Sequence, residues 1–562
     1  MPIQKFSAVR SRNRIGIADE DPTPEISTAL HGYVVYRFND ASIAAPGGLA
    51  TTATVIFRQA PERPRQIVTQ LEQWAPALLQ HGCLIFVQPS PTGTGTDLRP
   101  FREILVKAIK DFQLPVSGLT EEEFNQLGRS PADFSQPKFT PLVHILEGQG
   151  DWRQMLRYLQ QHPPGELPSP QPDVKCIDPD GSESALDEPE HVLLVQRAFW
   201  DSSEVRLEPL RNGLSGVDAY RAHVRQRVNQ VGGQWPYRYF IKIGDREKVT
   251  TEYMKYEGIA MAHLPYHLGP RLRLERCALG YRSGIIVSDY VSGAQPLKDC
   301  ARDGRAPAII ANLFNVTFRA WHNGAEDNEV RLQEHLKGRL PPAIPESRQP
   351  LTKKYGAKKS LAELGELLVA GESRPVSVGV IHGDLHATNV LVRGGDAILI
   401  DFEMVEEKAP LLRDLACLEG GIFIDGFVGD QRKPKTILDS VRCLYEPELL
   451  LDGHVRPCHP IDGSAWFFDC VMQIRMQARQ IERSDHQYAL VLASELMKKA
   501  CNKHDFDAAK SEKASGFGDR TKGHRKLRAN AVPIRTEQTR AMAYVLAEWI
   551  LTGLHASDGQ TN

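Results

Sequence analysis

The alternation of apolar and polar positions divides the chain into parts with different patterns. In the first part, short apolar runs at 33–38, 54–57, 83–87 and 142–146 alternate with helical periods at 62–80, 98–112 and 151–161. Strands that alternate with helices predict a small, doubly wound α/β domain over residues 29–161. Residues 1–28 are polar, and we expect them to be loosely ordered. The Pro-rich and then acidic segment 162–190 is typical of a linker.

The second part changes from strands to helices. Alternating or apolar runs at 205–210, 219–224, 237–243 and 284–291 predict strands, and 250–264 has the period of an amphipathic helix. Beyond them, helical periods recur at 308–322, 433–445, 465–483, 487–501 and 536–552. The sequence therefore predicts an α+β region, with a sheet-rich lobe at 191–291 and a helical lobe at 292–556.

One motif between these helices carries most of the chemistry. Asp384 follows Val-Ile-His-Gly, Asn389 comes five residues later, and Asp401 ends the apolar run 397–400. Asp384 can accept a proton from a hydroxyl group, while Asn389 and Asp401 offer oxygens to Mg²⁺. Glu403 points to the same side of an extended chain as Asp401 and could contact a second metal. Phosphoryl transfer from Mg-ATP requires such groups.

The alternative is an ordinary hairpin with a solvated aspartate. Any one of these residues alone would favour that interpretation, but the complete set at this spacing favours a kinase-like site.

The set resembles the aminoglycoside phosphotransferase and choline kinase group, which has the bilobal protein-kinase-like fold. The matching residues are His382, Gly383, Asp384, His386, Asn389, Asp401 and Asp414. The resemblance implies ATP and Mg²⁺ as cofactors, Asp384 as the catalytic base, and Asn389 and Asp401 as metal ligands. It also implies that His386 and Asp414 support the catalytic loop.

The same resemblance requires a nucleotide-binding lobe upstream. Gly213, Ser215 and Gly216 lie in a turn between two expected strands, where backbone amides could approach phosphates. An ordinary hairpin is the alternative. Lys242 on the next strand is the expected phosphate contact, although periodicity alone does not settle whether it faces inward.

A glutamate on the following helix should orient Lys242. We expect Glu252 in this role, with Glu257 as the alternative. Backbone groups around Asp289 and Val291 should meet adenine.

Two departures separate the chain from protein kinases. Asp401 and Asp414 are only 13 positions apart, which leaves little room for a peptide-docking segment, and the motif is Asp-Phe-Glu instead of Asp-Phe-Gly. These features favour a small-molecule or atypical kinase. The layout also resembles the kinase-like ternary-complex-associated domain proteins of bacterial conflict systems over about 188–560. That resemblance implies a signalling partner and leaves a protein acceptor open.

Composition restricts the other functional classes. The net charge of -2 argues against bulk nucleic-acid binding, and nine cysteines without a Cys-x-x-Cys pair indicate neither a zinc site nor a disulfide scaffold. No secretory signal or membrane span is evident, so we expect a cytoplasmic protein. Residues 498–528 hold ten Lys/Arg against four Asp/Glu. They form either an anion- or partner-binding segment or, as we favour, a solvated loop.

The sequence therefore predicts an ATP- and Mg²⁺-dependent phosphotransferase that acts on a hydroxyl of an unidentified acceptor. The alternative is a nucleotide-binding scaffold with weak or no transfer activity, which presents residues 29–161 to a protein partner.

Overall fold

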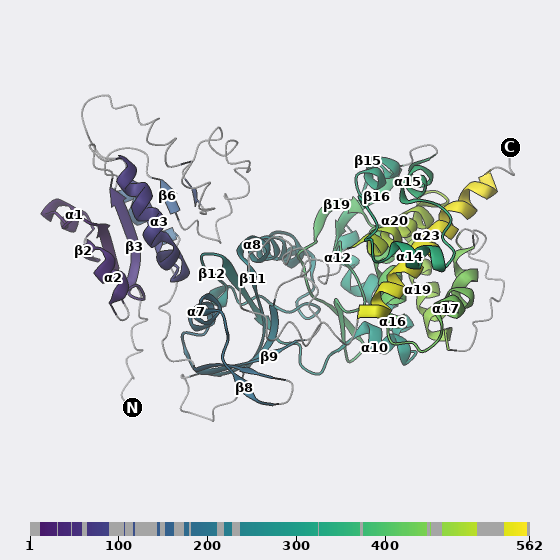
Figure 1. Ribbon diagram of the computed structural model, residues 1–562, viewed down its shortest axis with the longest axis horizontal. Helices are drawn as coiled ribbons and strands as arrows, with labels where there is room; N and C mark the ends of the chain where they lie inside the picture. The colour runs from purple at the N-terminus through teal and green to yellow at the C-terminus, as the bar shows by residue number, and fades with distance from the viewer. Residues whose placement is uncertain are drawn as a thin grey trace. The chain divides into compact units, whose positions relative to one another are not determined.

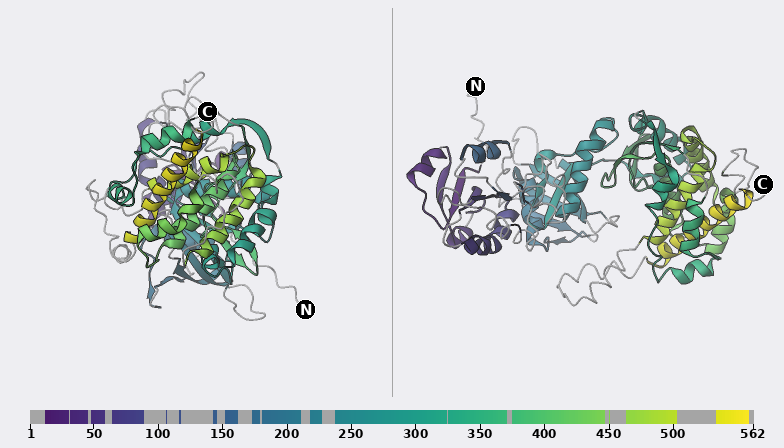
Figure 2. Two further views of the ribbon diagram at one scale, coloured as in Figure 1. Left: turned by 90° about the vertical axis from the view of Figure 1, so that its right-hand side faces the viewer. Right: turned by 90° about the horizontal axis from the view of Figure 1, so that it is seen from above.

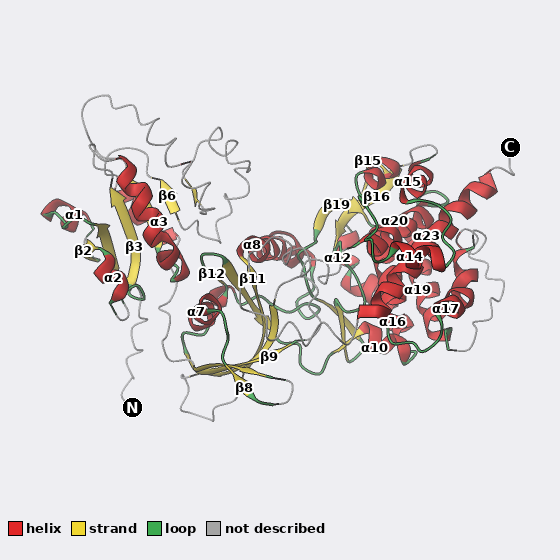
Figure 3. Ribbon diagram, viewed as in Figure 1, coloured by secondary structure: helices red, strands yellow, loops and turns green. Residues whose placement is uncertain are grey.

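The protein forms two compact units in a computed structural model. The first contains Met1–Thr251 and Leu272–Tyr290, and the second contains Glu252–Arg271 and Val291–Asn562. Strands are prominent in the first unit and helices in the second (Figures 1 and 3). The structure describes residues 12–30, 32–45, 48–58, 64–88, 106, 116–117, 143–145, 152–161, 173–178, 181–210, 218–226, 237–323, 325–370, 375–446, 450, 463–502 and 533–558.

A parallel sheet begins the first unit. Its strands are β1 (Arg14–Ala18), β2 (Val34–Phe38), β3 (Thr52–Arg58), β4 (Leu84–Gln88), β5 (Val116–Ser117) and β6 (Val143–Ile145). Their order is β2-β1-β3-β4-β6-β5, with parallel neighbours throughout. Helices α1 (Pro24–Ala29), α2 (Asp40–Ala44), α3 (Pro64–Gln80) and α6 (Trp152–Gln161) accompany it. Since β2 and β3 flank β1, the order is that of a doubly wound sheet, and the predicted α/β class is confirmed.

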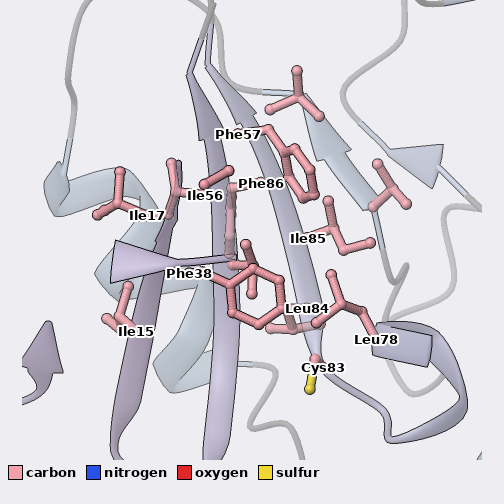
Figure 4. Close-up of a cluster of buried hydrophobic side chains, with 14 of the residues drawn as sticks. Ile15, Ile17, Phe38, Ile56, Phe57, Leu78, Cys83, Leu84, Ile85 and Phe86 are labelled. Atoms are coloured by element: carbon pink, nitrogen blue, oxygen red, sulfur yellow. The ribbon is translucent and has the colours of Figure 1, made fainter. Parts of the chain in front are cut away.

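The central strands of this sheet are buried on both faces. All five residues of β4 and all but the last residue of β3 are buried, as expected for parallel strands between helical layers. Their side chains share one apolar core with Ile15 and Ile17 of β1 and Phe38 of β2 (Figure 4).

The prediction that residues 1–28 are loosely ordered is wrong for Arg14–Ala18. This segment is strand β1, which lies between β2 and β3. Gly16 interrupts its apolar pattern, and a Cβ there would lie 2.7 Å from Cβ of Phe38. The neighbouring strand, and not a local pattern, therefore explains the glycine. The helix expected at 98–112 lies outside the described residues except for position 106.

A seven-stranded sheet forms the rest of the first unit. Its strands are β7 (Asp173–Ile177), β8 (Glu183–Ser184), β9 (Ser202–Pro209), β10 (Asp218–Gln226), β11 (Tyr237–Asp245), β12 (Ala278–Leu279) and β13 (Ser283–Asp289). The order is β12-β13-β11-β10-β9-β7-β8. Helix α7 (Pro189–Ala198) supplies Leu194 and Val195 to its core, and a 3-10 turn covers Leu274–Arg276.

The interpretation of 162–190 as a linker is wrong for its second half. Strands β7 and β8 extend the sheet, because β7 pairs in parallel with β9 from Asp173 to Cys176. Cys176 is buried in the same core as Val205 and Leu207 of β9. Acidic residues at exposed positions of β7 and β8 give these short strands the composition of a linker, so the sequence pattern did not indicate strands.

Helix α8 (Arg246–Lys255) links the two units and continues as a π-helical turn, Tyr256–Ala260, and α9 (Met261–His263). Within its described residues, the second unit also contains two three-stranded sheets. One has the order β14 (Gln295–Pro296), β17 (Val390–Arg393), β18 (Asp396–Leu399), and the other β15 (Glu326–Arg331), β16 (Pro375–Ile381), β19 (Glu406–Pro410).

Helices make up most of the second unit. They are α10 (Leu297–Arg302), α11 (Ala306–Asn312) with a π-helical turn at Leu313–Thr317, α12 (Arg319–His322), α13 (Leu332–Lys337), α14 (Gln349–Lys354), α15 (Leu361–Val369), α16 (Leu412–Phe427), α17 (Pro434–Val441) with a 3-10 turn at Arg442–Tyr445, α19 (Ala465–Ile481), α20 (Gln487–Cys501) and α23 (Pro533–Asp558). The green and yellow ribbons in Figure 2 show them gathered as a bundle. The predicted sheet-rich and helical lobes are both confirmed.

Helix α16 lies at the centre of this bundle and contacts α19, α20 and α23. It is buried along nearly its whole length. Its Glu419 accepts hydrogen bonds from Arg475 of α19 at 3.1 and 2.7 Å and from the Tyr488 hydroxyl of α20 at 2.7 Å. A buried carboxylate needs such partners, so this network specifies how the three helices meet.

No helix among the described residues is long and apolar enough to cross a membrane. Seven cysteines in these residues are free thiols, whereas Cys443 is disulfide-bonded.

Candidate active site

The loop from His382 to Asn389 is held between β16 and the β17–β18 hairpin. Gly383 turns the chain with φ of 77°. A Cβ on this residue would lie 2.0 Å from the backbone oxygen of Met404, so no other residue fits without moving the chain. The glycine of the His-Gly-Asp motif therefore has a steric explanation.

Gly383→Ala is expected to displace the loop, because both the positive φ and the Met404 carbonyl oppose a side chain. We expect a lower unfolding midpoint and reduced nucleotide turnover, measured by thermal denaturation and ADP release. Gly394→Ala is the control, since its φ of 61° is also positive but nothing lies within 4 Å of its Cβ position. Equal effects of the two substitutions would contradict the steric argument.

Asp414 of α16 holds the backbone at the start of this loop. Its carboxylate is fully buried and accepts hydrogen bonds from the backbone N–H of His382 at 2.7 Å and of Gly383 at 2.9 Å. Burial raises the pKa of Asp414, and the two N–H donors offset part of that effect. The side chain thus acts on the backbone that precedes Asp384.

Asp384 is the carboxylate of this loop, and 42% of its side chain is accessible. His386 Nε2 lies 3.5 Å from Asp384 Oδ2, and Thr388 Oγ1 lies 2.6 Å from His386 Nδ1, which orients the imidazole. Burial alone would raise the pKa of Asp384, but hydrogen bonding to His386 and the charge of Lys499 outweigh it and hold that pKa below its ordinary value. Asp384 is therefore ionised and accessible.

The β17–β18 hairpin brings Asp401, the second expected metal ligand, close to Asn389 at the end of this loop. The backbone N–H of Ile400 donates to the carbonyl of Asn389 at 3.0 Å, which places Asp401 next to Asn389. The Asn389 amide nitrogen donates to the Asp384 carbonyl at 3.0 Å, so its side-chain oxygen is the atom that can coordinate a cation. Asp401 has φ of 69°, a conformation that non-glycine residues rarely adopt and that is concentrated at functional sites.

A group of three carboxylates surrounds Asp401. One oxygen each of Glu252, Asp401 and Glu403 lies within 4.8 Å of the others. Carboxylates this close repel one another, and hard divalent cations prefer such oxygen ligands. The donor set therefore fits Mg²⁺. The expected proximity of Glu403 to Asp401 is present, and Glu252 lies beside them.

The expected nucleotide contacts lie mostly in the first unit. Lys242 on β11 is only 7% exposed, and its strand neighbours are Ala219 and Ile286. Ile241 and Ile243 enter the core of the sheet, so Lys242 takes the other face, which periodicity had left open. Gly213, Ser215 and Gly216 lie outside the described residues.

Asp289 ends β13 and pairs with Arg273, with 2.7 Å between Oδ1 and Nε. Val291 begins the following segment and is partly buried. Their backbone therefore lies at the end of β13 and in the segment directly after it.

Sequence reasoning missed two polar residues beside the loop. Asp425 of α16 has its Oδ2 4.0 Å from His386 Nδ1, and Lys499 of α20 acts electrostatically on Asp384. Neither belongs to a motif. The one available signal in the sequence was a polar residue, Asp425 or Lys499, within a helix that is mostly buried.

Residues 216–418 match the sequence model of the phosphotransferase enzyme family, and residues 359–495 match that of ternary complex associated domain 9. No curated protein matches the chain.

Solved structures that are similar include aminoglycoside phosphotransferase APH(4)-Ia with AMP-PNP and hygromycin B, at 13% identity and TM-score 0.33, covering 61% of this chain and 93% of the other. Amicoumacin kinase hAmiN with AMP-PNP and Ca²⁺ has 11% identity and TM-score 0.33, covering 62% and 88%. APH(3'')-Id from Streptomyces rimosus has 15% identity and TM-score 0.27, covering 52% and 99%.

The sheet-rich and helical lobes with this catalytic loop define a kinase-like fold. Residues 216–418 belong to the phosphotransferase enzyme family, and the overlapping residues 359–495 carry ternary complex associated domain 9. Both resemblances that the motifs suggested are confirmed.

Proposed function

We propose that the protein is an ATP- and Mg²⁺-dependent phosphotransferase that transfers the γ-phosphoryl group to a hydroxyl of its acceptor. The observation that carries this proposal is the hydrogen-bonded unit of Asp384, Asn389 and Asp401. The Asn389 side chain binds the backbone of Asp384, and the Asn389 backbone binds that of Ile400, directly before Asp401. These two hydrogen bonds connect the proposed base to the two proposed cation ligands, and such an arrangement suits phosphoryl transfer.

In this mechanism, Asp384 aligns the acceptor hydroxyl and accepts its proton. The hydroxyl oxygen forms a bond to the γ-phosphorus while the bond to the departing ADP oxygen breaks. Asn389 and Asp401 would hold Mg²⁺, with Glu403 as a further ligand, and the bound ion would neutralise charge on the phosphates. His386 keeps the Asp384 carboxylate oriented. Most of the rate would come from positioning and charge neutralisation.

The nucleotide contacts are part of the proposal. Lys242 would bind the ATP phosphates, and Glu252 would orient Lys242. Gly213, Ser215 and Gly216 would approach the phosphates through their backbone, and the backbone around Asp289 and Val291 would bind adenine. The position of Lys242 on the face of β11 away from the core cluster supports this assignment.

Asp401→Asn is expected to weaken Mg²⁺ binding, so that ATP turnover requires more Mg²⁺. Loss of a direct ligand should raise the Mg²⁺ concentration for half-maximal activity by at least the roughly 10- to 100-fold that outer-sphere changes cost. ADP release measured across a Mg²⁺ titration checks this, and EDTA should abolish wild-type turnover. The control is Glu407→Gln, an exposed carboxylate on β19. An unchanged Mg²⁺ requirement in Asp401→Asn would rule out its role as a ligand.

The second candidate is a nucleotide-binding scaffold that presents residues 29–161 to a protein partner. The match to ternary complex associated domain 9 favours this function. Incubation of the purified protein with γ-labelled ATP, alone and with candidate acceptors, separates the two. Labelled product or self-labelling supports transfer, whereas tight ATP binding without turnover supports the scaffold. We propose a cytoplasmic location for either function.

A further inference from the structure

Helix α16 has two adjacent glycines in the middle of a buried helix. A Cβ on Gly421 would lie 2.8 Å from Cβ of His386, and a Cβ on Gly420 would lie 3.3 Å from Cδ and 3.5 Å from Cε of Lys499. Glycine inside a helix is unfavourable relative to alanine, so two in succession indicate a packing requirement. Here they allow the catalytic loop and the Lys499 side chain to lie against the same turn of α16.

Lys499 is a stable cation in this position. Burial alone would lower the pKa of Lys499, but its surroundings outweigh burial and raise that pKa above its ordinary value. Burial also raises the pKa of Cys417 to about 12, so this neighbouring thiol is neutral. The groups that stabilise the ammonium are therefore three carboxylates from the loop and both helices: Asp384, Glu495 and Asp425.

The ammonium group retains hydrogen-bonding capacity. Among the described residues, no carboxylate oxygen lies within 4.0 Å of Lys499 Nζ, whereas the adjacent Lys498 pairs with Glu495 at 3.8 Å. The carboxylates near Lys499 thus maintain its charge without forming a direct ion pair. A partly buried ammonium with three N–H donors is suited to binding an oxygen anion.

We propose that Lys499 is a specificity-determining residue that binds an anionic group, phosphate or carboxylate, beside the acceptor hydroxyl that Asp384 aligns. This inference rests on the proposed phosphotransferase function and names its substrate class. Asp384, Asp425 and Glu495 would repel an anion, so the anionic group must contact the Lys499 ammonium directly. A cationic group placed there would meet the ammonium and be disfavoured.

Four sugars that differ mainly in charge test this inference: glucosamine, glucose, glucuronate and glucose 6-phosphate. Binding is measured by calorimetry on the full chain saturated with Mg²⁺ and AMP-PNP. A hydrogen-bonded charge contact predicts that at least one anionic sugar binds about tenfold or more tightly than glucose, with glucosamine weakest. Comparison of the two anions shows whether phosphate or carboxylate is preferred.

Lys499→Met should remove the preference for anions, and Lys499→Arg should retain most of it. Lys498→Met is the matched control, because it removes the same charge one residue away from a lysine paired with Glu495. Thermal unfolding and AMP-PNP affinity show whether each variant is folded. Equal binding of all four sugars by the wild type, or a preference that survives in Lys499→Met, would overturn the inference. Absence of AMP-PNP binding by the wild type would instead overturn the proposed function on which it rests.

Discussion

Asp384→Asn is expected to lower phosphoryl transfer by about 10²- to 10⁴-fold, the range that general acid–base groups contribute. The amide keeps the size of the side chain but cannot accept the proton of the acceptor hydroxyl. Nucleotide affinity should change little, because Asp384 faces the acceptor in the proposed mechanism. The measurement is single-turnover transfer from γ-labelled ATP, together with AMP-PNP affinity by calorimetry.

The matched control is Asp396→Asn, on the β17–β18 hairpin. Asp396 opposes Arg393 across the turn of this hairpin and does not belong to the proposed base–metal unit. Its substitution should leave transfer within about twofold of the wild type, as surface changes have small effects. Full turnover by Asp384→Asn would eliminate the proposed base. A loss of AMP-PNP binding would instead indicate that Asp384 holds the nucleotide.

Asp414→Ala has the second large expected effect, and it acts through the backbone. The substitution leaves the buried N–H groups of His382 and Gly383 without their acceptors. Each unsatisfied donor should cost about 1–3 kcal/mol of the free energy of unfolding, measured by denaturant titration. The rate of phosphoryl transfer should fall by more than the loss of folded protein explains, because the same N–H groups position the backbone before Asp384.

Asp414→Asn distinguishes anchoring from a general loss of structure. Its amide retains one acceptor oxygen, so the stability loss should be smaller than in Asp414→Ala. Asp439→Ala, at an exposed acidic position of α17, is the control and should alter stability by only about 0.5 kcal/mol. If Asp414→Ala matched this control in both stability and transfer, the anchoring role would be wrong.

The sequence predicted the lobes and the catalytic motif well because both depend on local patterns. The strands around Lys242 and the helix at 487–501 follow periods of about two and about 3.6 residues that are visible without any neighbour. The base, the amide and the second carboxylate lie within one short segment, so the hairpin between Val390 and Leu399 is enough to bring them together.

The errors came from segments whose structure depends on their neighbours. Strand β1 is short and contains Gly16, which only the adjacent Phe38 explains. Strands β7 and β8 carry acidic residues and become part of the fold by pairing at one edge of the sheet. A short strand gains most of its stability from cross-strand contacts, which a local pattern does not reveal.

The sequence by itself determined the fold class and led to the proposed base and the proposed metal-binding oxygens, because their chemistry follows from residue type and spacing. Only the tertiary structure decided that Lys242 takes the face away from the core cluster, that Glu252 lies beside Asp401, and that Lys499 packs against α16 next to the catalytic loop. The physical reason is that helix packing sets these distances. Two adjacent glycines on α16 allow α20 and the loop to approach, and nothing near Lys499 in the sequence encodes that approach.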